Sequence, residues 1–528
     1  MSYPDRVVTT ALEDGCEDSS KTENCIVHKH LDWRVPWAQA LILVFLYSFP
    51  AFVCLRGMGI ADPDVWWHLR TGEWIMQHHA VPRVDTFSSF TAGKSWSAYS
   101  WLFDLLIVQL FQRFGLIGIM AYTTGMGLAI TMALHRLIRS LQTDFSYAVL
   151  ITVLACFCLL PLWTPRPWLF TILFFTLELG LLLHARRSGH CLPLLWLPVI
   201  FALWANTHIQ FIDGLVVLVI ALVESALAGR WITAQTRLRF GTLGLISCAC
   251  VLATWVNPYG WNIYRVAYDL ATQTGVLNKV SELQALPFRS YSDWGVLLIT
   301  LCAVGTLVRI RQGVFLGTLL AFAIYVSFHS QRDLWVVVIT GSAILSLSVA
   351  GREMNGFRIK RTWMPIIAAV AVLIVVSESL VLKINNDKLQ EKLSESMPVR
   401  AAEFVKERGL QGPLFNDYGW GGYLIWSLRI PVSIDGRAAL QGDQHIDDSV
   451  ATWGGQTRWV SDPELANAKL VIGPVNSPLT QLLRLDPRYQ LQFEDKIATV
   501  FVSRNGTTGQ HSVFSGKVAT AQSGLAAK

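Results

Sequence analysis

The feature that most limits how this chain folds is a succession of apolar runs that fills most of the sequence before residue 384. A helix needs about 20 mostly apolar residues to cross a bilayer core, or about 17 at the short end. Charged residues make up only 15% of the chain and hydrophobic residues 52%, whereas a soluble globular protein carries roughly 25% charged residues. Lipid, rather than water, should therefore surround most of this chain.

Ten apolar runs are candidate membrane helices, near residues 37–55, 147–163, 168–184, 191–205, 211–228, 240–256, 293–308, 313–328, 333–350 and 362–383. One further stretch, 97–134, fits either two short crossings or one crossing plus a helix lying at the membrane surface. The sequence therefore predicts an α-helical polytopic membrane bundle, and the number of its crossings depends on this stretch.

Charge decides between the two readings. If each of the ten runs crosses once, five short cationic loops lie on one face: Arg136 and Arg139; Arg186 and Arg187; Arg230, Arg237 and Arg239; Arg309 and Arg311; Arg352, Arg358, Lys360 and Arg361. Such loops are typically cytoplasmic. With a cytoplasmic N-terminal tail, 1–36, the stretch 97–134 must cross an odd number of times. This gives eleven crossings in a transmembrane domain, 37–383, of the cell (inner or plasma) membrane.

The character of the chain changes after residue 384. MPVRAAEFVKERG is typical of a helix, and PLFN, PVSID, AKLVIG and IATVFV are typical of short strands separated by Gly, Pro and Asp turns. We expect a small α/β domain, 384–504, on the external face. A Gly-, Ser-, Thr- and Ala-rich tail, 505–528, is expected to be disordered.

The predicted topology places the first polar loop, 56–96, on the external face. Asp62 followed by Pro63 is a typical start of a helix, and in that helix Asp64 and His68 lie four residues apart on one face. Tryptophans beside them, Trp67 among these, would rest on the membrane surface. Alternatively, Asp62 and Asp64 only stabilise the helix N-terminus through its dipole.

Other external loops carry further candidates. Asn206 and His208 lie in WANTHIQ and Arg332 in HSQRD, while Lys279 and Glu282 lie in the loop 257–292. An arginine near a membrane needs an anionic partner, which for Arg332 is either Asp333 or a lipid phosphate. Ordinary interfacial or solvated roles explain His208, Lys279 and Glu282 equally well. Asp104 and Glu178, inside apolar runs, are expected to pair within the bundle.

These motifs together resemble those of a known superfamily. DPDVWWHLRTGEWI, PRVDTFS, WANTHIQF, NPYGW, FNDYGWGGYLIW and SIDGR, in this order among apolar segments, resemble a bacterial branch of the C-type (GT-C) membrane glycosyltransferases. These enzymes are related in architecture to protein O-mannosyltransferases. The resemblance covers most of residues 37–505 in architecture, and its motifs are specific to the branch rather than to one activity.

The resemblance implies transfer of a sugar from a polyprenyl-phosphate carrier to a glycan, lipid or protein acceptor on the external (periplasmic) face. An acidic residue of the first external loop would act at the catalytic centre, here Asp64, with Asp62 as the rival and His68 beside them. Candidate substrate-binding residues are Asn206, His208, Lys279, Glu282, Arg332 and Trp67. The resemblance leaves a divalent metal open. We expect no bound organic cofactor and no nucleic-acid partner.

The sequence is also compatible with two other functions. A transporter or flippase of a lipid-linked intermediate would use charged residues inside the bundle, for which the sequence offers Asp104, Glu178 and Glu224. A non-catalytic scaffold of an envelope complex would use the C-terminal domain to bind a partner. Either function would leave the acids of the first external loop without a catalytic role.

Overall fold

The protein is described by a computed structural model that covers residues 34–57, 60, 62–228, 238–272, 280–310, 314–348, 361–457 and 459–504. Several predictions concern residues outside these ranges: most of the N-terminal tail, the tail 505–528, Lys279, and the loop cations Arg230, Arg237, Arg311, Arg352, Arg358 and Lys360.

Each of the ten predicted apolar runs overlaps a helix of the bundle. These helices are α1 (Arg34–Gly57), α5 (Phe145–Cys158), α6 (Trp168–Ser188), α7 (Leu197–Thr207), α8 (Phe211–Leu227), α9 (Phe240–Thr254), α12 (Tyr291–Ile310), α13 (Val314–His329), α14 (Trp335–Leu345) and α15 (Met364–Val381). The stretch 97–134 forms the short helix α3 (Trp101–Phe114) and the long helix α4 (Leu116–Leu141). They meet at Gly115, whose φ of +65° suits a residue without a side chain.

Five helices in the described part of the chain are long and apolar enough to cross a membrane: the segments Trp37–Arg56, Leu116–Leu141, Trp168–Ser188, Tyr291–Ile310 and Met364–Val381. Others are apolar but shorter, such as α5, α9 and α13. The protein therefore has the helices of a membrane protein. The number of eleven crossings and the orientation of the chain stay predictions.

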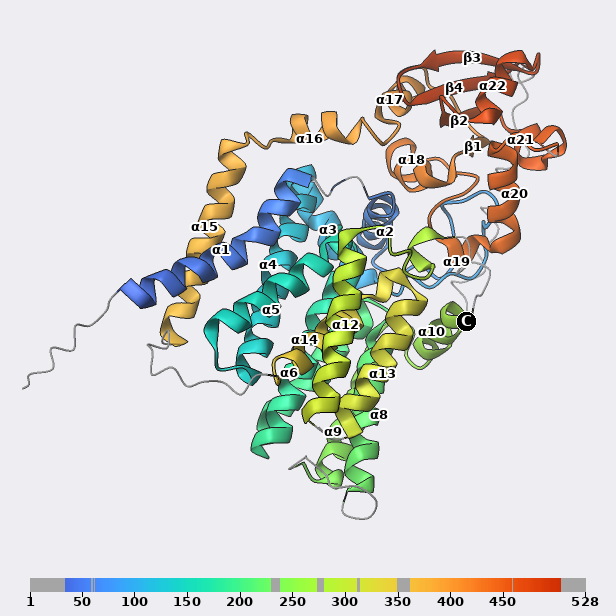
Figure 1. The fold of residues 1–528 in the computed structure, drawn as a ribbon. Coiled ribbons are helices and arrows are strands. Elements are labelled where there is room, and N and C mark those ends of the chain that lie inside the picture. The colour runs from blue at the N-terminus through green and yellow to red at the C-terminus, as the bar shows by residue number, and fades with distance from the viewer. Residues whose placement is uncertain are drawn as a thin grey trace, which may run out of the picture.

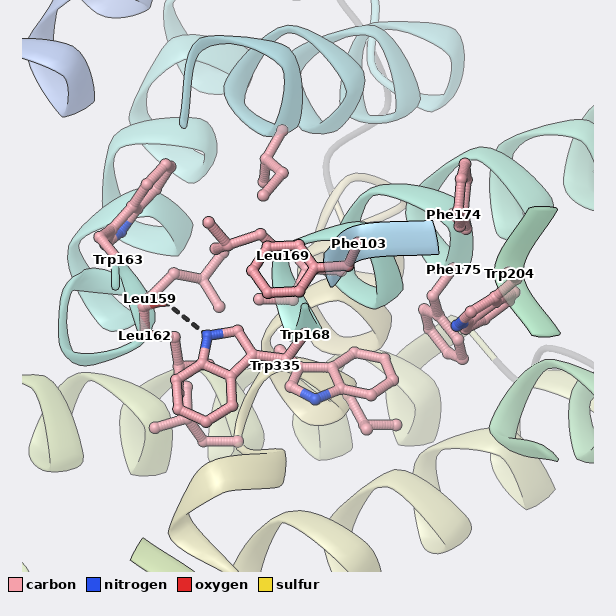
Figure 2. Close-up of a cluster of buried hydrophobic side chains, with 14 of the residues drawn as sticks. Phe103, Leu159, Leu162, Trp163, Trp168, Leu169, Phe174, Phe175, Trp204 and Trp335 are labelled. Carbon is pink, nitrogen blue, oxygen red and sulfur yellow. Dashed lines mark hydrogen bonds between the residues drawn. The ribbon is translucent and has the colours of Figure 1, made fainter. Parts of the chain in front are cut away.

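The centre of the bundle is packed with large side chains. All residues of α14 are buried, and its Trp335 contacts Phe175 of α6 with ring centroids 5.0 Å apart. Figure 2 shows this cluster, in which the Trp168 indole N–H donates to the Leu162 carbonyl at 2.9 Å. At one edge of the bundle, α15 lies beside α1 (Figure 1), and a small apolar cluster joins them. This packing provides a rigid base for the loops at the helix ends.

The C-terminal part forms a small sheet with helices, as predicted. Its strands are β1 (Leu414–Asn416), β2 (Leu470–Pro474), β3 (Tyr489–Glu494) and β4 (Ala498–Ser503), in the order β1-β2-β4-β3. β1 and β2 are parallel, and the other pairs are antiparallel. Sequence reasoning missed β3, and PVSID is not a strand of this sheet. Instead, Val432 of that segment pairs with Ser88 of the first loop.

The other helices of this part are α16 (Asn386–Leu393), α17 (Val399–Glu407), α18 (Gly421–Leu428), α19 (Ala438–Gln441), α20 (Asp443–Trp453), α21 (Pro463–Asn467) and α22 (Pro478–Leu485). Between α9 and α12 lies α10 (Asn262–Thr272). Short 3-10 helices cover Leu160–Leu162, Leu192–Trp196, Ser281–Leu283, Gln331–Asp333, Arg361–Trp363, Tyr418–Trp420 and Trp459–Ser461.

The first polar loop contains α2 (Val65–His78), which corrects two predictions. The helix begins at Val65, not next to Asp62, because the Asp62 carboxylate accepts the Asp64 backbone N–H at 2.9 Å and forms a turn before it. Nor does its tryptophan face rest on the membrane. Helix α2 packs against α3 and α18, and Trp66 is buried against Tyr423, with ring centroids 5.0 Å apart.

Candidate active site

Three carboxylates meet around one arginine where α2 begins. The Arg166 Nε donates to both oxygens of Asp62, at 2.9 and 2.7 Å. Its Nη1 lies 2.5 Å from Asp64 Oδ2 and 3.2 Å from Glu282 Oε1. Asp62, Asp64 and Arg166 are largely buried, and Glu282 is about one-third exposed. We call these four residues the acidic centre.

The local sequence explains how Arg166 reaches this place. It lies in the TPRP turn between α5 and α6, where two prolines limit the backbone. Its carbonyl accepts the Tyr122 hydroxyl at 2.9 Å, and its guanidinium lies over the Trp168 ring, 4.8 Å from the centroid. The side chain is therefore held from both ends and directed at the acids.

Burial is the main electrostatic influence on Asp64. It raises the pKa of this carboxyl to about 7, with Asp62 and Glu282 adding to the rise and Arg166 opposing it. Burial alone would lower the pKa of Arg166, but the surrounding Asp62, Asp64 and Glu282 carboxylates raise it. Near neutral pH the centre thus holds a permanent cation and a carboxyl group that can gain or lose a proton.

The C-terminal domain forms one wall of the acidic centre. Gly436 of the SIDGR segment is so close that a Cβ added there would lie 1.9 Å from Asp64 Oδ1. A Cβ on Gly422 would lie 2.5 Å from the Pro63 carbonyl. Tyr418 also interacts electrostatically with Asp64. The site is therefore built from both ends of the chain.

His68 lies close by but does not pair with Asp64. Its Nδ1 is 2.5 Å from Asp104 Oδ1, both side chains are buried, and the Trp67 ring stacks on the imidazole with centroids 3.5 Å apart. Burial, followed by the charge of Arg166, lowers the pKa of His68 well below its usual value. Asp104, which was expected to pair within the bundle, is therefore bound to a residue of α2 in the first polar loop, His68.

A second cationic group lies near the ends of α7 and α13. Arg332 forms no ion pair with Asp333 or with any other described residue, and its Nε is buried without a hydrogen-bond partner there. Asp333 instead accepts a hydrogen bond from Gln210. His208 is within electrostatic reach of Arg332 and is hydrogen-bonded to Thr171 Oγ1 at 2.8 Å. Of the two expected partners, Asp333 is therefore wrong, and an anion from outside the chain stays a prediction.

Tyr99 connects the two groups. Its hydroxyl is within electrostatic reach of Arg332 as well as of Asp64, Asp104 and Arg166. Burial raises the pKa of its hydroxyl, so the group stays protonated and can donate a hydrogen bond. The site thus contains Asp64, which can gain or lose a proton near neutral pH, and Arg332, which has no ion-pair partner among the described residues.

Comparison with solved structures identifies the architecture. The archaeal oligosaccharyltransferase AglB from Archaeoglobus fulgidus, solved with an inhibitory peptide and a dolichol-phosphate, superposes with a TM-score of 0.52 at 11% identity, over 83% of this chain and 69% of that one. The fold of this chain is therefore similar to that of an archaeal oligosaccharyltransferase. A second A. fulgidus oligosaccharyltransferase structure, with Zn and sulfate, gives a TM-score of 0.46 at 13% identity, over 84% of this chain and 68% of that one. No protein-family model and no curated protein sequence matches.

Within this fold, the predicted site residues take different positions. Asp62, Asp64 and Glu282 come together, and His208 lies near Arg332. Asn206 has a packing role, because it accepts the Trp101 indole N–H at 2.7 Å and donates to the Ala202 and Val256 carbonyls at 2.7 and 2.6 Å. Neither its carbonyl nor its amide group is left over for a substrate.

Sequence reasoning missed three residues of the site: Arg166, Tyr418 and Gly436. Tyr418 and Gly436 lie in FNDYGWGGYLIW and SIDGR, which carried the family resemblance without a role for either residue, and Arg166 lies in TPRP, an external loop of the predicted topology. The sequence feature that could have identified Arg166 is its place between two prolines at the end of an apolar run. A permanent charge in so short a turn needs a partner.

The described residues of the acidic centre do not form a ready metal centre. The described part of the chain contains no group of three or more His, Cys, Asp or Glu side chains placed to hold a metal ion. Asp62, Asp64 and Glu282 converge, but on the Arg166 guanidinium. Their arrangement suits this cation, so no chemical step is assigned to a metal. The resemblance left a divalent metal open, and these residues do not decide it.

Proposed function

We propose that this protein is a membrane glycosyltransferase that transfers a sugar from a polyprenyl-phosphate carrier to an acceptor on the external face, with Asp64 as general base. The observation that carries the proposal is the acidic centre beside an unpaired Arg332 in a GT-C fold. The similar AglB structure holds a dolichol-phosphate and a peptide, which supports a lipid-linked donor and a separate acceptor.

Asp64 suits the general base better than Asp62 does. Arg166 engages both oxygens of Asp62 but only Oδ2 of Asp64, and the Asp62 carboxylate also accepts the Asp64 backbone N–H. A carboxylate whose pKa lies near the working pH is efficient at accepting a proton, and such help is worth roughly a hundred- to ten-thousand-fold in rate. Asp62 acts through Arg166 by keeping the guanidinium in place.

In the proposed reaction, an acceptor hydroxyl attacks the anomeric carbon of the sugar while Asp64 takes the hydroxyl proton. The bond between this carbon and the phosphate oxygen breaks, and the electron pair leaves with the polyprenyl phosphate. Arg332 binds that phosphate through charge-assisted hydrogen bonds. The buried, unpartnered Nε of Arg332 and Oγ of Ser330 are donors that a phosphate would satisfy.

A transport function receives less support. Of the three acids that the sequence offered for it, Asp104 bonds to His68 and Glu224 pairs with Arg186. Glu178 alone is buried without a hydrogen-bond partner among the described residues, contrary to the expectation that it would pair in the bundle. One acid of this kind does not make a path across the bundle.

Mass spectrometry of lipids and glycans in native membranes tests the proposal. The strains compared contain the intact protein, no protein, Asp64→Asn or Arg332→Gln, with Asp387→Asn as the matched control, because Asp387 is exposed in α16 away from the site. We expect one polyprenyl-linked sugar to accumulate, and one glycan to disappear, in the deletion, Asp64→Asn and Arg332→Gln strains only. A wild-type profile for Asp64→Asn, with a changed profile for the deletion, would show that the acid has no catalytic role.

A further inference from the structure

The segment 429–441 of the C-terminal domain is bound to the first polar loop by its backbone. The Ser89 N–H donates to the Val432 carbonyl at 2.8 Å, and the Val432 N–H donates to the Phe87 carbonyl at 3.1 Å. The Ser88 hydroxyl donates to the Ser433 carbonyl at 3.2 Å. The segment predicted to be a strand of the C-terminal sheet thus joins the domain to the loop that carries Asp64.

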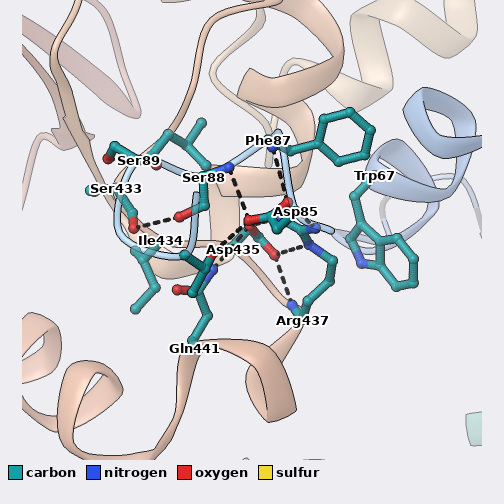
Figure 3. Close-up of polar contacts among 12 residues, drawn as sticks. Trp67, Asp85, Phe87, Ser88, Ser89, Ser433, Ile434, Asp435, Arg437 and Gln441 are labelled. Carbon is teal, nitrogen blue, oxygen red and sulfur yellow. Dashed lines mark hydrogen bonds and ion pairs between the residues drawn. The ribbon is translucent and has the colours of Figure 1, made fainter. Parts of the chain in front are cut away.

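A buried ion cluster strengthens this junction, and Figure 3 shows its members from both partners. Arg437 Nη1 donates to Asp85 Oδ1 at 2.7 Å, while its Nε and Nη2 donate to Asp435 Oδ1 and Oδ2 at 2.8 and 2.7 Å. The guanidinium is 3% exposed and both carboxylates are fully buried. It also lies over the Trp96 ring, 4.7 Å from the centroid. We call Asp85, Asp435 and Arg437 the Arg437 cluster.

The orientation of each side chain in the Arg437 cluster is fixed by several hydrogen bonds. Asp85 also accepts the Phe87 backbone N–H at 3.0 Å and the Thr91 hydroxyl at 2.5 Å. Its orientation is therefore fixed by contacts within its own loop, independently of Arg437. A planar guanidinium carries its donors in a rigid fork, so two carboxylates bound to it have a defined orientation relative to each other. The position of the backbone on either side of Arg437 is therefore defined closely.

Gly436 lies between the two C-terminal members of this cluster. Since a Cβ at this position would lie 1.9 Å from Asp64 Oδ1, the glycine backbone is in contact with the carboxylate. Asp64 is thus enclosed by Gly436 on one side and Arg166 on the other. Moving the Gly436 backbone by a fraction of an ångström would change the space open to that carboxylate.

We propose that Arg437 is a positioning residue: by joining Asp85 and Asp435 it holds Gly436 against Asp64 and fixes the orientation of that carboxylate. The inference rests on the proposed function, in which Asp64 is the general base. The C-terminal domain then does more than cover the bundle, because it sets the geometry of a residue in the first polar loop. In this proposal, the SIDGR motif provides Asp435 and Arg437 for the cluster, and it provides Gly436 at a position next to Asp64 where a side chain would not fit.

A second contact between the same two parts offers a matched control. Arg429 donates to Glu73 Oε2 and Oε1 at 2.6 and 2.8 Å, which also ties the C-terminal domain to the first loop. Glu73 lies in the third turn of α2, beyond the residues that surround Asp64. Loss of Arg429 therefore weakens the junction without removing the support of Gly436.

The test measures the reactivity of Asp64 without any substrate. The purified full chain in detergent is treated with dicyclohexylcarbodiimide, which reacts with protonated carboxyl groups, from pH 5 to pH 9, and labelling of Asp64 is read by mass spectrometry. The groups that face Asp64 and remain in every variant are Asp62, Tyr99, Arg166, Glu282 and Tyr418. Arg437→Lys and Gly436→Ala also keep every charge of the wild type, so a change in the midpoint of these two variants reports the geometry around the carboxyl.

For Arg437→Gln we expect the midpoint of labelling to fall by about one pH unit, because the carboxyl becomes more accessible to water and its charged form is less penalised. Arg437→Lys should give a smaller shift in the same direction, and Arg429→Gln should keep the wild-type midpoint. If Arg437→Gln does not fold, Gly436→Ala is the variant that tests the proposal. Its added methyl group must displace Asp64 or the loop, and this should change the midpoint of labelling.

An unchanged midpoint in both Arg437→Gln and Gly436→Ala would overturn the proposal, as would an equal shift in Arg429→Gln. The outcome is separate from that of the proposed function. A shifted midpoint in a protein that changes no lipid-linked sugar would contradict the transferase and leave the positioning of Asp64 by Arg437 intact.

Discussion

Arg166 is the residue on which the acidic centre depends. Its guanidinium contacts three carboxylates that come from the first polar loop and from the segment before α12. In a buried group of this kind, removal of the single cation leaves like charges close together, and their pKa values rise. The proton affinity of Asp64 is therefore set by a residue that does not take the proton itself.

The pH dependence of transfer follows from this arrangement. Asp64 must be ionised to accept a proton, and since its pKa is raised to about 7, we expect transfer to fall about tenfold per pH unit well below pH 7 and to reach a plateau above pH 8. Because Arg166 lowers this pKa, Arg166→Gln should move the rise to higher pH. Initial rates in membrane vesicles from pH 5 to pH 9 measure this, and a flat profile in the wild type would contradict it.

At the scale of elements, α2 shows what the sequence could and could not predict. The apolar runs located the bundle helices, because twenty apolar residues in a row have few other uses. The tryptophans of α2 were placed at the membrane surface, yet Trp66 is covered by α18, which comes from residues far along the chain. An amphipathic pattern shows that one face of a helix is covered, but it does not show whether lipid or another part of the protein covers it. PVSID was misassigned for the same reason, since its pairing partner is Ser88.

Helices α3 and α7 are joined to the segment after α9 by Asn206, whose three hydrogen bonds are all internal. Asn206→Ala should therefore destabilise the folded protein by roughly 1–3 kcal/mol, because buried partners lose their bonds. The affinity for the lipid-linked donor should stay unchanged. Thermal unfolding in detergent and the donor concentration that gives half-maximal rate measure the two quantities. Weaker donor binding with unchanged stability would restore Asn206 as a substrate-binding residue.

At the scale of the whole molecule, the acidic centre, Arg332 and the C-terminal domain all belong to one end of the bundle. Helix α2, with Asp64 directly before it, lies beside α18 of the C-terminal domain (Figure 1). Arg136, Arg139, Arg186, Arg187 and Arg309, predicted to lie in loops, instead lie in the last turns of α4, α6 and α12, which start near this end. The positive-inside rule then predicts that the whole site is external.

Reporter fusions test this orientation. Alkaline phosphatase fused after residue 504 should be active, because the enzyme folds only outside the cytoplasm, whereas the same reporter inserted at Gln142, between α4 and α5, should be inactive. A fluorescent protein that matures only in the cytoplasm should give the opposite result at the two positions. Phosphatase activity at Gln142 with none after residue 504 would invert the topology.

The contact between Gly436 and Asp64 also bears on how the enzyme is made. The two residues come from opposite ends of the chain, so the ribosome releases the first long before it completes the second. A nascent chain therefore has its helices in the membrane while the carboxylate is still open to water. Under the proposed function and topology, Asp64 meets Gly436 only after the C-terminal domain has been exported and has folded. We therefore predict that activity begins only after synthesis of the chain is complete.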